Sequence, residues 1–334
     1  MSGLSKVIDV LRRYNRFLIT THKDPEGDSL GSQLGLFGLL SQLGKAAYMV
    51  NEDPVPPTYR FLPWNEKIIT VDKSPILRHI DVLLVVDCPN KERIGKTAEY
   101  MVEGRLVVNI DHHISNDGFG DVNWIDPEAS AAGEMIYRLF KKMKMSINRE
   151  EAMCIYVAIL TDTGSFRYGN TSSRVHRIAS ELLRYGLNPQ KIASSIYEAK
   201  RPQALKLLAM TLGTLNISDD GKIAWVKITN EMFRSTGAYS NEIEGFVDYP
   251  RLLGGVKVAL LFRETSKENG IKVSLRAKGG VNVNNIASHF GGGGHQAASG
   301  CLVKGPMNEV ERVVIERVKK ELFDVKRYPE KKTT

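Results

Sequence analysis

Short apolar runs alternate with stretches of helical spacing over the first 188 residues of the chain. Near the start, this spacing places Leu4, Val7, Ile8 and Leu11 on one helix face. The pattern predicts buried strands at 17–22, 46–50, 81–87 and 105–111, and helices at 4–14, 29–44, 130–144, 149–160 and 172–186. Strands that alternate with helices predict an α/β fold, with a mostly parallel sheet and helices on both of its faces.

Three glycines interrupt the apolar helix predicted at 29–44. Gly31, Gly35 and Gly38 stand at spacings i, i+4 and i+7, so they share one helix face. Glycine costs a helix about 1 kcal/mol relative to alanine. We therefore expect this face to pack closely against a neighbouring element.

The pattern changes after about residue 210. Period-two alternation over 256–262 and 271–276 predicts two strands, and in the second one Lys272, Ser274 and Arg276 share the polar face. We expect a smaller α+β domain whose sheet has one face open to solvent or ligand. The predicted divisions are a first domain at 1–188, a helical connector at 189–209, a second domain at 210–325 and a basic tail at 326–334.

Composition is that of an ordinary globular protein, with 42% hydrophobic and 25% charged residues among 334. The net charge of +8 is compatible with an anionic substrate. No apolar run reaches the roughly 18 residues of a membrane helix, and charges interrupt the N-terminal segment where a signal peptide needs an apolar core. The three cysteines are scattered, which fits a reducing compartment. We expect a cytoplasmic protein with no membrane partner.

Acidic residues and histidines gather where the predicted strands end. The stretch THKDPEGDSLGS places His22, Asp24, Glu26 and Asp28 directly after the first strand. Like charges this close repel each other, so the cluster gains little without a compensating ligand.

Further residues of these types end other elements. Asp87 ends the strand 81–87, the triplet Asp111, His112 and His113 ends the strand 105–111, and Asp162 follows an apolar helix. A single aspartate at such a place is usually a turn former or a helix cap. Ligands of open α/β sheets bind beyond the carboxyl ends of the strands, so these clusters can converge on one crevice.

A set of carboxylates and imidazoles without thiolates suits Mn²⁺ or a similar divalent ion better than structural zinc. The number of ligands exceeds what one ion needs. Two ions about 3.5–4 Å apart, bridged by a shared carboxylate, are the usual device for hydrolysing phosphoesters. The expected cofactor is therefore a pair of divalent metal ions, most simply two Mn²⁺.

The order of these motifs resembles the DHH phosphoesterase superfamily. The resemblance rests on H-x-x-x-E-G-D at 22–28, Asp87, the triplet DHH at 111–113 and TDTG at 161–164. The stretch FGGGGHQAASG at 290–300 is similar to the DHHA1 domain that accompanies DHH domains. The nearest subgroup is the NrnA type, which combines oligoribonuclease and pAp phosphatase activities.

The resemblance implies a role for each residue of the cluster. One metal would be held by His22, Glu26 and Asp162, and the other by Asp28 and His112, with Asp87 as the bridge. His113 would lie beside the phosphate, so that Asp87, His112 and His113 form the catalytic group.

The chain departs from the usual pattern of this family at several positions. Glu26 stands where the family usually has aspartate, and Asp24 where it usually has a residue that is not acidic. Asp24 precedes Pro25, which favours an extended backbone, so we expect its side chain to turn away from the metals. The stretch SAAGEM at 130–135 lacks the family's usual hydroxyl residues, which puts hydrogen bonds from that loop in doubt.

The glycine run in the second domain points to substrate binding. Glycine lets a backbone approach a ligand closely, although glycines alone are more often a flexible turn. His295 follows the run, and Arg276 presents a planar fork that fits phosphate. The resemblance agrees, and the expected substrate-binding residues are His113, Arg276, Gly291, Gly292, Gly293, Gly294 and His295.

The predicted function is two-metal hydrolysis of oligoribonucleotides about two to five nucleotides long, with dephosphorylation of 3′-phosphoadenosine 5′-phosphate as a second activity. The partner is then a short RNA or a dinucleotide, and a homodimer stays open. Cleavage of cyclic or linear dinucleotides uses the same site and is the alternative. Two rivals are a nucleotide-binding regulator that has lost catalysis and a manganese pyrophosphatase, against which the GGGGH domain argues.

Overall fold

The computed structural model describes residues 2–73, 79–102, 104–198, 200–265, 270–278 and 280–327. The chain forms two compact units, Met1–Ala199 and Lys200–Thr334, and each is described by itself. The division lies inside the predicted connector at 189–209. Within the described ranges, no helix combines the length and the apolar character needed to cross a membrane.

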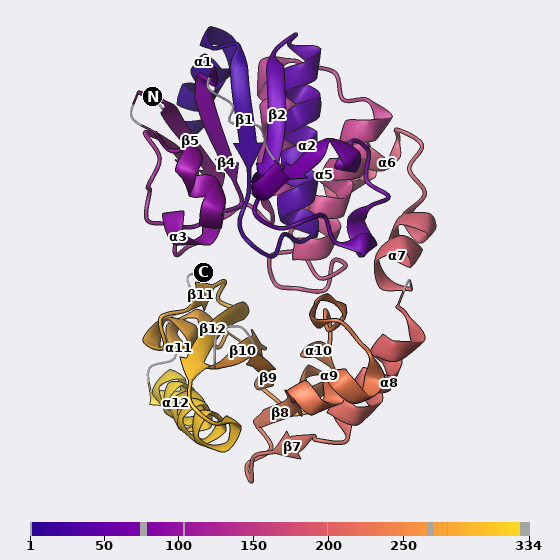
Figure 1. The fold of residues 1–334 in the computed structure, drawn as a ribbon, viewed down its shortest axis with the longest axis vertical. Coiled ribbons are helices and arrows are strands. Elements are labelled where there is room, and N and C mark those ends of the chain that lie inside the picture. Colours follow the sequence, from indigo (N-terminus) through magenta and orange to yellow (C-terminus); the bar gives the residue numbers. More distant parts are fainter. Residues whose placement is uncertain are drawn as a thin grey trace. The chain divides into compact units, whose positions relative to one another are not determined.

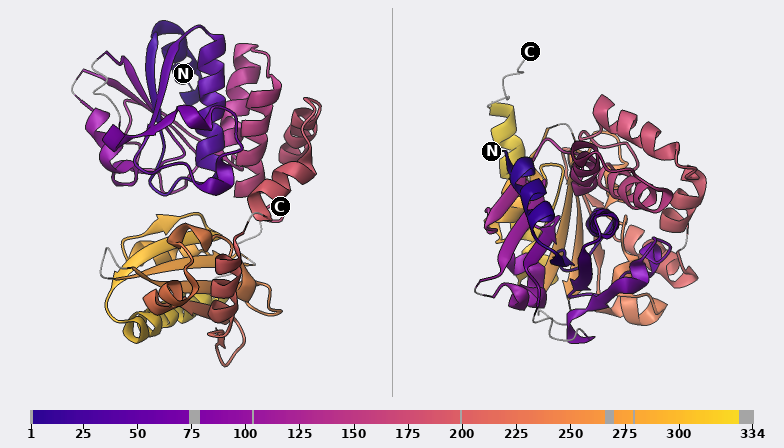
Figure 2. Two further views of the ribbon diagram at one scale, coloured as in Figure 1. Left: turned by 45° about the vertical axis from the view of Figure 1, so that its right-hand side comes forward. Right: turned by 90° about the horizontal axis from the view of Figure 1, so that it is seen from above.

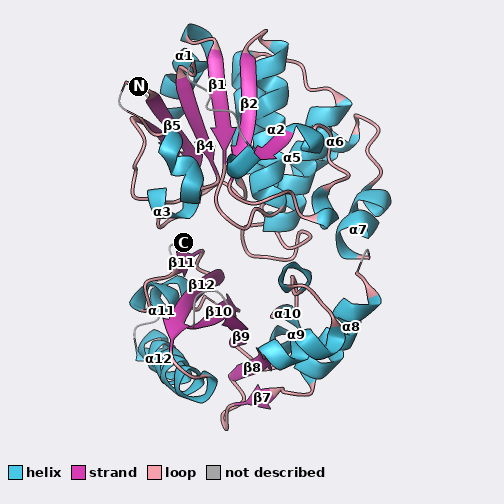
Figure 3. Cartoon of the chain, in the orientation of Figure 1, coloured by secondary structure: helices cyan, strands magenta, loops and turns pink. Residues whose placement is uncertain are grey.

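The first unit contains a six-stranded sheet, and all of its strands are parallel. The arrows drawn for β1, β2 and β4 in Figure 3 point to the same edge. The strands are β1 (Arg16–Thr20), β2 (Ala46–Asn51), β3 (Ile68–Thr70), β4 (Val82–Val86), β5 (Leu106–Asp111) and β6 (Val122–Ile125). The parallel sheet and the strands expected at 17–22, 46–50, 81–87 and 105–111 are confirmed.

The strand order is β3-β2-β1-β4-β5-β6, so β1 and β4 are neighbours in the middle of the sheet. Their register pairs Leu18 with Leu83. The chain leaves β1 toward one edge and leaves β4 toward the other, which opens a crevice at their carboxyl ends. The loops after β1 and β4 therefore face each other across this crevice.

Helices cover the sheet on both faces, as predicted. The helices are α1 (Gly3–Arg13), α2 (Gly27–Gln42), α3 (Lys91–Ile94), α4 (Ala132–Met143), α5 (Arg149–Asp162), α6 (Ser173–Leu183) and α7 (Pro189–Tyr197), with short turns η1 (Pro57–Tyr59), η2 (Asn65–Lys67), η3 (Val71–Lys73) and η4 (Gly95–Tyr100). Alternate strand residues divide between the faces: Phe17 and Ile19 join the core under α1, α2, α4 and α5. Leu18 joins a smaller core that includes Ile94 and Tyr100.

Helices α2 and α5 pack against each other, and they lie side by side in Figure 1 and in the left view of Figure 2. A Cβ atom added at Gly31 would lie 2.4 Å from the carbonyl oxygen of Cys154. At Gly38 it would lie 2.5 Å from Glu151 Cγ, and at Gly35 it would lie 3.3 Å from Ile155 Cγ1. The predicted close packing of this glycine face is confirmed.

The second unit contains a mixed six-stranded sheet in the order β11-β12-β10-β9-β8-β7. Strands β8 and β9 are parallel, and the other pairs are antiparallel. The elements are α8 (Pro202–Leu212), β7 (Asn216–Ile217), β8 (Ile223–Ile228), α9 (Asn230–Thr236), η5 (Ser240–Glu242), α10 (Asp248–Arg251), β9 (Val258–Thr265), β10 (Gly270–Ala277), α11 (Val283–His289), β11 (Gly293–Gly294), β12 (Ala298–Lys304) and α12 (Met307–Arg327).

Both faces of β9 are buried, so the expectation of an open sheet face is wrong at this strand. Val258, Leu260 and Phe262 pack in the core with α11 and α12. Leu261 points to the other face, where it joins a core with Leu207 of α8. On β10 the alternate residues Lys272, Ser274 and Arg276 are half-buried, so the polar face expected there is partly covered.

Pro202 begins a helix instead of interrupting one. It occupies the first turn of α8, where its missing N–H is not needed for helical bonding. The predicted helical connector is therefore two helices, α7 and α8, of which α7 belongs to the first unit and α8 to the second.

Candidate functional site

The candidate residues of the first unit lie at the carboxyl edge of the sheet. His22 follows β1 by two residues, and Asp87 comes directly after β4. Asp111 is the last residue of β5, and His112 and His113 continue the chain beyond it. Because the strands are parallel, all three loops meet at the same edge.

Two helices bring further carboxylates to this edge. Asp28 lies in the first turn of α2 and is 1% exposed, and Asp162 is the last residue of α5. The helix was expected to end before Asp162, but it continues through this residue before the turn begins. The close contact between α2 and α5 places the start of one helix beside the end of the other.

Asp87 lies at the centre of the cluster. Its Oδ1 atom lies 3.6 Å from His112 Nε2 and 3.6 Å from His113 Nδ1, and its Oδ2 atom lies 3.6 Å from His22 Nε2. These distances are too long for hydrogen bonds. Among the described residues, none forms a hydrogen bond with the buried Oδ1 atom.

Three sets of potential ligand atoms share Asp87. They are His22 with Glu26, Asp28 with His112, and Asp111 with His113, and in each set the atoms lie within 4.8 Å of one another. His112 Nε2 also lies 3.4 Å from Asp28 Oδ2 and 3.7 Å from Asp162 Oδ2. The structure thus brings together the six predicted metal ligands, which are His22, Glu26, Asp28, Asp87, His112 and Asp162.

Two imidazole rings are oriented by backbone carbonyls. His22 Nδ1 lies 2.6 Å from the carbonyl oxygen of Lys23, and His112 Nδ1 lies 3.1 Å from that of Ala129. A carbonyl oxygen can only accept, so Nδ1 donates in each of these contacts and Nε2 is the ring nitrogen that faces Asp87. This arrangement is the one found behind histidines that bind metals.

Backbone amides at the start of α4 hold the carboxylate of Asp28. Ala132 N–H donates to Oδ2 at 2.7 Å, and Gly133 N–H donates to Oδ1 at 2.9 Å. The hydroxyl of Ser32 donates to Oδ1 as well, at 2.9 Å. The doubt about hydrogen bonds from the SAAGEM stretch is therefore removed, because the main chain supplies them.

Asp111 orients His113. Its Oδ1 atom lies 2.7 Å from His113 Nδ1, and its Oδ2 atom accepts from the side-chain amide of Asn116 at 2.6 Å. Sequence reasoning gave Asp111 no role of its own and did not single out Asn116. The DHH triplet was a signal for Asp111, but nothing in the sequence pattern points to Asn116.

The backbone at Asp87 adopts φ of +53°, in the left-handed region. Residues other than glycine rarely adopt this conformation, although aspartate and asparagine tolerate it best. Strain of this kind clusters at functional sites, where the surrounding structure enforces it. Here it turns the chain sharply after β4, so the carboxylate stays at the sheet edge.

Electrostatics in the cluster are strongly perturbed. Burial, together with the charge of Asp87, raises the pKa of Asp28 well above its ordinary value. Burial also raises the pKa of Asp162, to about 7. At Asp87 burial acts in the same direction, but contacts with His112 and His22 outweigh it and hold the pKa well below its usual range.

A divalent cation bound in the cluster would offset the cost of burying these carboxylates close together. The site gathers carboxylates whose pKa is raised by burial, a buried oxygen of Asp87 and the Nε2 atoms of His22 and His112. Together these atoms form a donor set for cations. The ligands are oxygen and imidazole nitrogen, and the described part of the cluster contains no thiolate. The residues present therefore fit a divalent metal centre.

Asp24 does not have the extended backbone that Pro25 was expected to impose. Its φ is +53°, and its N–H donates to Asp53 Oδ2 at 2.9 Å. This bond ties the loop after β1 to the loop after β2 and offsets the unfavourable backbone angle. Asp24 is exposed and belongs to none of the ligand sets around Asp87.

The predicted substrate-binding residues other than His113 lie in the second unit. Arg276 is on β10, opposite Ala298 of β12, and its buried Nε atom has no hydrogen-bond partner among the described residues. Gly293 and Gly294 form β11 and pair with Gly300 and Ser299.

The glycine run is shaped by its packing against β12. A Cβ atom at Gly292 would lie 2.2 Å from the carbonyl oxygen of Gly300, and one at Gly294 would lie 2.6 Å from that of Ala298. His295 N–H donates to the same Ala298 carbonyl at 2.8 Å. The run is therefore paired backbone, and Gly291 lies at its start.

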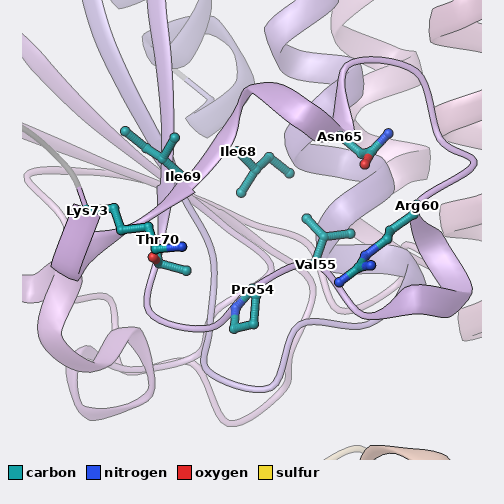
Figure 4. Close-up of a pocket in the computed structure, with 8 residues that line it drawn as sticks. All are labelled: Pro54, Val55, Arg60, Asn65, Ile68, Ile69, Thr70 and Lys73. Carbon is teal, nitrogen blue, oxygen red and sulfur yellow. The ribbon is translucent and has the colours of Figure 1, made fainter.

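A pocket of about 320 Å³ lies at the β3 edge of the sheet (Figure 4). Its lining is formed by Pro54, Val55, Arg60, Asn65, Ile68, Ile69, Thr70 and Lys73. None of the predicted site residues lines it, so it is separate from the cluster around Asp87.

Comparison with known proteins identifies the fold and its two parts. Residues 16–159 match the DHH family, N-terminal domain, and residues 221–322 match the DHHA1 domain. A Thermus thermophilus protein named bifunctional oligoribonuclease and PAP phosphatase NrnA is 36% identical, over 91% of this chain and 89% of its own length. The chain belongs to the DHH family. A DHH protein of the same name from Bacillus subtilis is 28% identical, over 93% of this chain and 96% of its own.

A solved structure is similar to this chain over nearly its whole length. It is an exopolyphosphatase-related protein from Bacteroides fragilis, with 27% identity, a TM-score of 0.86 and 98% of each chain covered. Within the DHH family the chain groups with the NrnA type. The first unit carries the DHH match and the second unit carries the DHHA1 match.

Proposed function

We propose that this protein hydrolyses oligoribonucleotides of about two to five nucleotides to mononucleotides, and also removes a phosphate from 3′-phosphoadenosine 5′-phosphate. The observation that carries the proposal is the convergence of three histidines on the buried carboxylate of Asp87. The names of the Thermus thermophilus and Bacillus subtilis relatives support both activities.

The centre is proposed to hold two ions, most simply Mn²⁺. One ion would be held by His22, Glu26 and Asp162, and the other by Asp28 and His112. Asp87 would bind both ions. Bound there, the cations would supply Lewis acidity for the attack of water on a phosphoryl group and charge to offset its oxygens. The ligand chemistry of carboxylate and imidazole supports manganese over a thiolate-preferring ion.

The protein's own groups prepare the site for this chemistry. The carbonyls of Lys23 and Ala129 fix the tautomers of His22 and His112 before any ligand arrives. Asp111 holds His113 in one orientation, with Nε2 left to contact a phosphate oxygen. Preorganised groups of this kind need little rearrangement during the reaction.

Arg276, His295 and the glycines at 291–294 are proposed to hold the rest of the substrate. The buried Nε atom of Arg276, which has no partner among the described residues, supports a phosphate contact. The cytoplasm is the proposed location. The three cysteines are free and buried, which suits a reducing compartment.

Turnover of a substrate panel tests the proposal. The full chain with Mn²⁺ receives RNA of two, five and twenty-four nucleotides, a cyclic dinucleotide, phosphoadenosine phosphate and pyrophosphate. We expect the dinucleotide and the pentanucleotide to be cleaved faster than the 24-mer, and phosphoadenosine phosphate to lose one phosphate.

Each alternative has its own outcome. Faster cleavage of the cyclic dinucleotide would favour the messenger-degrading function, and turnover of pyrophosphate alone would favour a pyrophosphatase. Binding of nucleotides without any turnover would indicate a regulator. Asp87→Asn serves as the control, because a contaminating nuclease would remain active in that preparation.

A further inference from the structure

We propose that Glu134 is a positioning residue of the metal centre. It lies in the first turn of α4 and is fully buried. With Arg174, it fixes the segment 129–133, whose backbone orients the metal ligands. This inference rests on the proposed metal centre and is independent of which substrate is cleaved.

The carboxylate of Glu134 makes specific contacts. Its Oε2 atom accepts from the backbone N–H of Ser130 at 3.0 Å and from the Ser130 hydroxyl at 2.9 Å. Arg174 Nε lies 2.6 Å from its Oε1 atom. An isolated buried carboxylate is strongly unfavourable, so these contacts offset the cost of burying Glu134.

The segment held by Glu134 contacts two of the predicted ligands directly. The carbonyl of Ala129 accepts from His112 Nδ1 at 3.1 Å. The amides of Ala132 and Gly133 donate to the two oxygens of Asp28. A shift of this segment would therefore move the ligands of one proposed ion together.

A third ligand is linked to the same segment through one amide group. The side chain of Asn170 donates to the carbonyl of Ser130 at 2.9 Å and to the carbonyl of Asp162 at 3.1 Å. Ser130 is thus held by Glu134 on one side and connected to Asp162 on the other. Ligands from α2, α5 and the loop after β5 all depend on this short stretch.

The start of α4 shows why a glutamate is needed here. Ala131 is the N-cap and has no side-chain oxygen, so it cannot cap the helix. Asp28 from α2 supplies the anion that the first amides of α4 require. Glu134 then reaches back to Ser130, one residue further than the third residue of a helix reaches in a capping box.

Glu134 has a simpler alternative role, which is to stabilise the fold. Glu151 is a matched control, because it is also buried, at 1% exposed, and also bridges a helix start. It accepts from Asn148 N–H at 2.7 Å and from the Gln42 side chain at 2.9 Å. It lies in the first turn of α5, at the opposite end from Asp162, so its loss should not disturb the ligands.

Metal affinity of the full chain, prepared without metal, distinguishes these roles. Mn²⁺ binding is measured by calorimetry for the wild type, Glu134→Ala, Glu134→Gln, Arg174→Met and Glu151→Ala, together with the melting temperature of each metal-free protein. We expect Glu134→Ala to weaken at least one Mn²⁺ site by about 10- to 100-fold, as loss of an outer-shell partner does. Glu134→Gln should fall in between, because its amide oxygen still accepts from Ser130.

The control variant should change stability and not metal affinity. Glu151→Ala should lower the melting temperature and leave Mn²⁺ affinity unchanged. The inference is overturned if Glu134→Ala binds Mn²⁺ as the wild type does, or if Glu151→Ala weakens binding equally. If Glu134→Ala does not fold, the Mn²⁺ affinities of Glu134→Gln and Arg174→Met provide the test. The inference is overturned if both variants bind Mn²⁺ as tightly as the wild type does.

The result is separable from the test of the proposed function. A wild-type chain that binds Mn²⁺ but hydrolyses none of the substrates would overturn the proposed function and leave the role of Glu134 standing. Unchanged Mn²⁺ affinity in the variants, with normal substrate turnover, would overturn the role of Glu134 alone.

Discussion

At Asp87, the backbone conformation places the charged side chain at the centre of the site. The left-handed φ of +53° turns the chain at the end of β4, and the carboxylate then lies among three imidazoles. Asparagine tolerates this backbone region about as well as aspartate does. A substitution at this position can therefore separate the role of the charge from the role of the backbone.

We predict that Asp87→Asn removes activity and keeps the fold. The amide preserves shape and backbone preference but lacks the negative charge that a bridging ligand needs. Activity should fall by more than about 100-fold, the upper range for loss of an outer-shell partner. Turnover of a dinucleotide and the melting temperature without metal are the measurements. A variant that retains a tenth of the activity would show that Asp87 is no bridge.

The loop after β1 provides a second comparison, between Asp24 and Glu26. Glu26 shares a ligand set with His22 and Asp87, whereas the carboxylate of Asp24 is in none of the sets. We expect Asp24→Asn to keep most activity and Glu26→Gln to lose a large fraction of it and to bind Mn²⁺ more weakly. Glu26→Asp should fall between them, because it keeps the charge and shortens the reach.

The rates are measured at saturating Mn²⁺. Equal losses in Asp24→Asn and Glu26→Gln would place Asp24 among the ligands and contradict this prediction.

Sequence reasoning located the ligand types because each one stands at a strand or helix end. It was wrong about the backbone conformation of Asp24, since the bias from Pro25 is a local preference and the hydrogen bond to Asp53 is a contact across 29 residues. It also missed the amides of Ala132 and Gly133, because every residue has a backbone amide and side-chain patterns do not mark it. Contacts of this kind are visible only after folding.

At the scale of elements, the contact between the start of α2 and the end of α5 brings Asp28 and Asp162 to the same site. Gly31 touches the backbone of α5, so the two helices approach more closely than side chains would allow. The spacing of the glycines predicted this contact, but it did not indicate which helix would be the partner. That identity depends on the order of the layers, which no local pattern encodes.

We predict that Gly31→Ala destabilises the protein by about 1–3 kcal/mol, the range for overpacking a core. The new Cβ would lie 2.4 Å from a backbone oxygen, and this outweighs the gain of about 1 kcal/mol in helix propensity. Gly35→Ala is the matched control in the same helix. Its Cβ would lie 3.3 Å from Ile155 Cγ1, nearly an ångström further than the contact at Gly31, so Gly35→Ala should lose less stability.

Urea unfolding of both variants measures the difference. Equal stability losses in Gly31→Ala and Gly35→Ala would mean that backbone contact with α5 is not the cause.

At the scale of the whole molecule, we predict that metal binding is linked to folding. In the folded state, burial raises the pKa of Asp28 and Asp162, and the charge of Asp87 adds to this effect. The unfolded chain exposes these carboxylates and separates them. An ion that binds only the folded state stabilises it by about 2.7 kcal/mol at a concentration 100 times its Kd. The metal-free protein should therefore melt at a lower temperature than the protein with Mn²⁺.

Thermal unfolding with EDTA and with added Mn²⁺ measures this link, with Ca²⁺ at equal ionic strength as the control. We also expect EDTA to abolish turnover and Mn²⁺ to restore it better than Mg²⁺. Full activity in excess chelator, after dialysis, would contradict the metal centre.

The two units have separate predicted tasks, and this yields a prediction for the full chain. Arg276→Ala and His295→Ala should raise KM for a dinucleotide more than they change metal content, because they lie in the second unit and are assigned to substrate. Steady-state kinetics and metal analysis of the same preparations provide the measurement. Loss of bound metal with unchanged KM would reverse the assignment.

The glycine contact between α2 and α5 has a consequence for metal selectivity. Asp28 lies in the first turn of α2 and α5 ends at Asp162, and both carboxylates flank the same nitrogen of His112. In the proposed metal centre, the separation of the two helix axes would set the distance between these two carboxylates. We therefore expect a substitution on the buried face of α2, one turn away from any ligand, to shift the preference between a smaller and a larger cation without altering a donor atom.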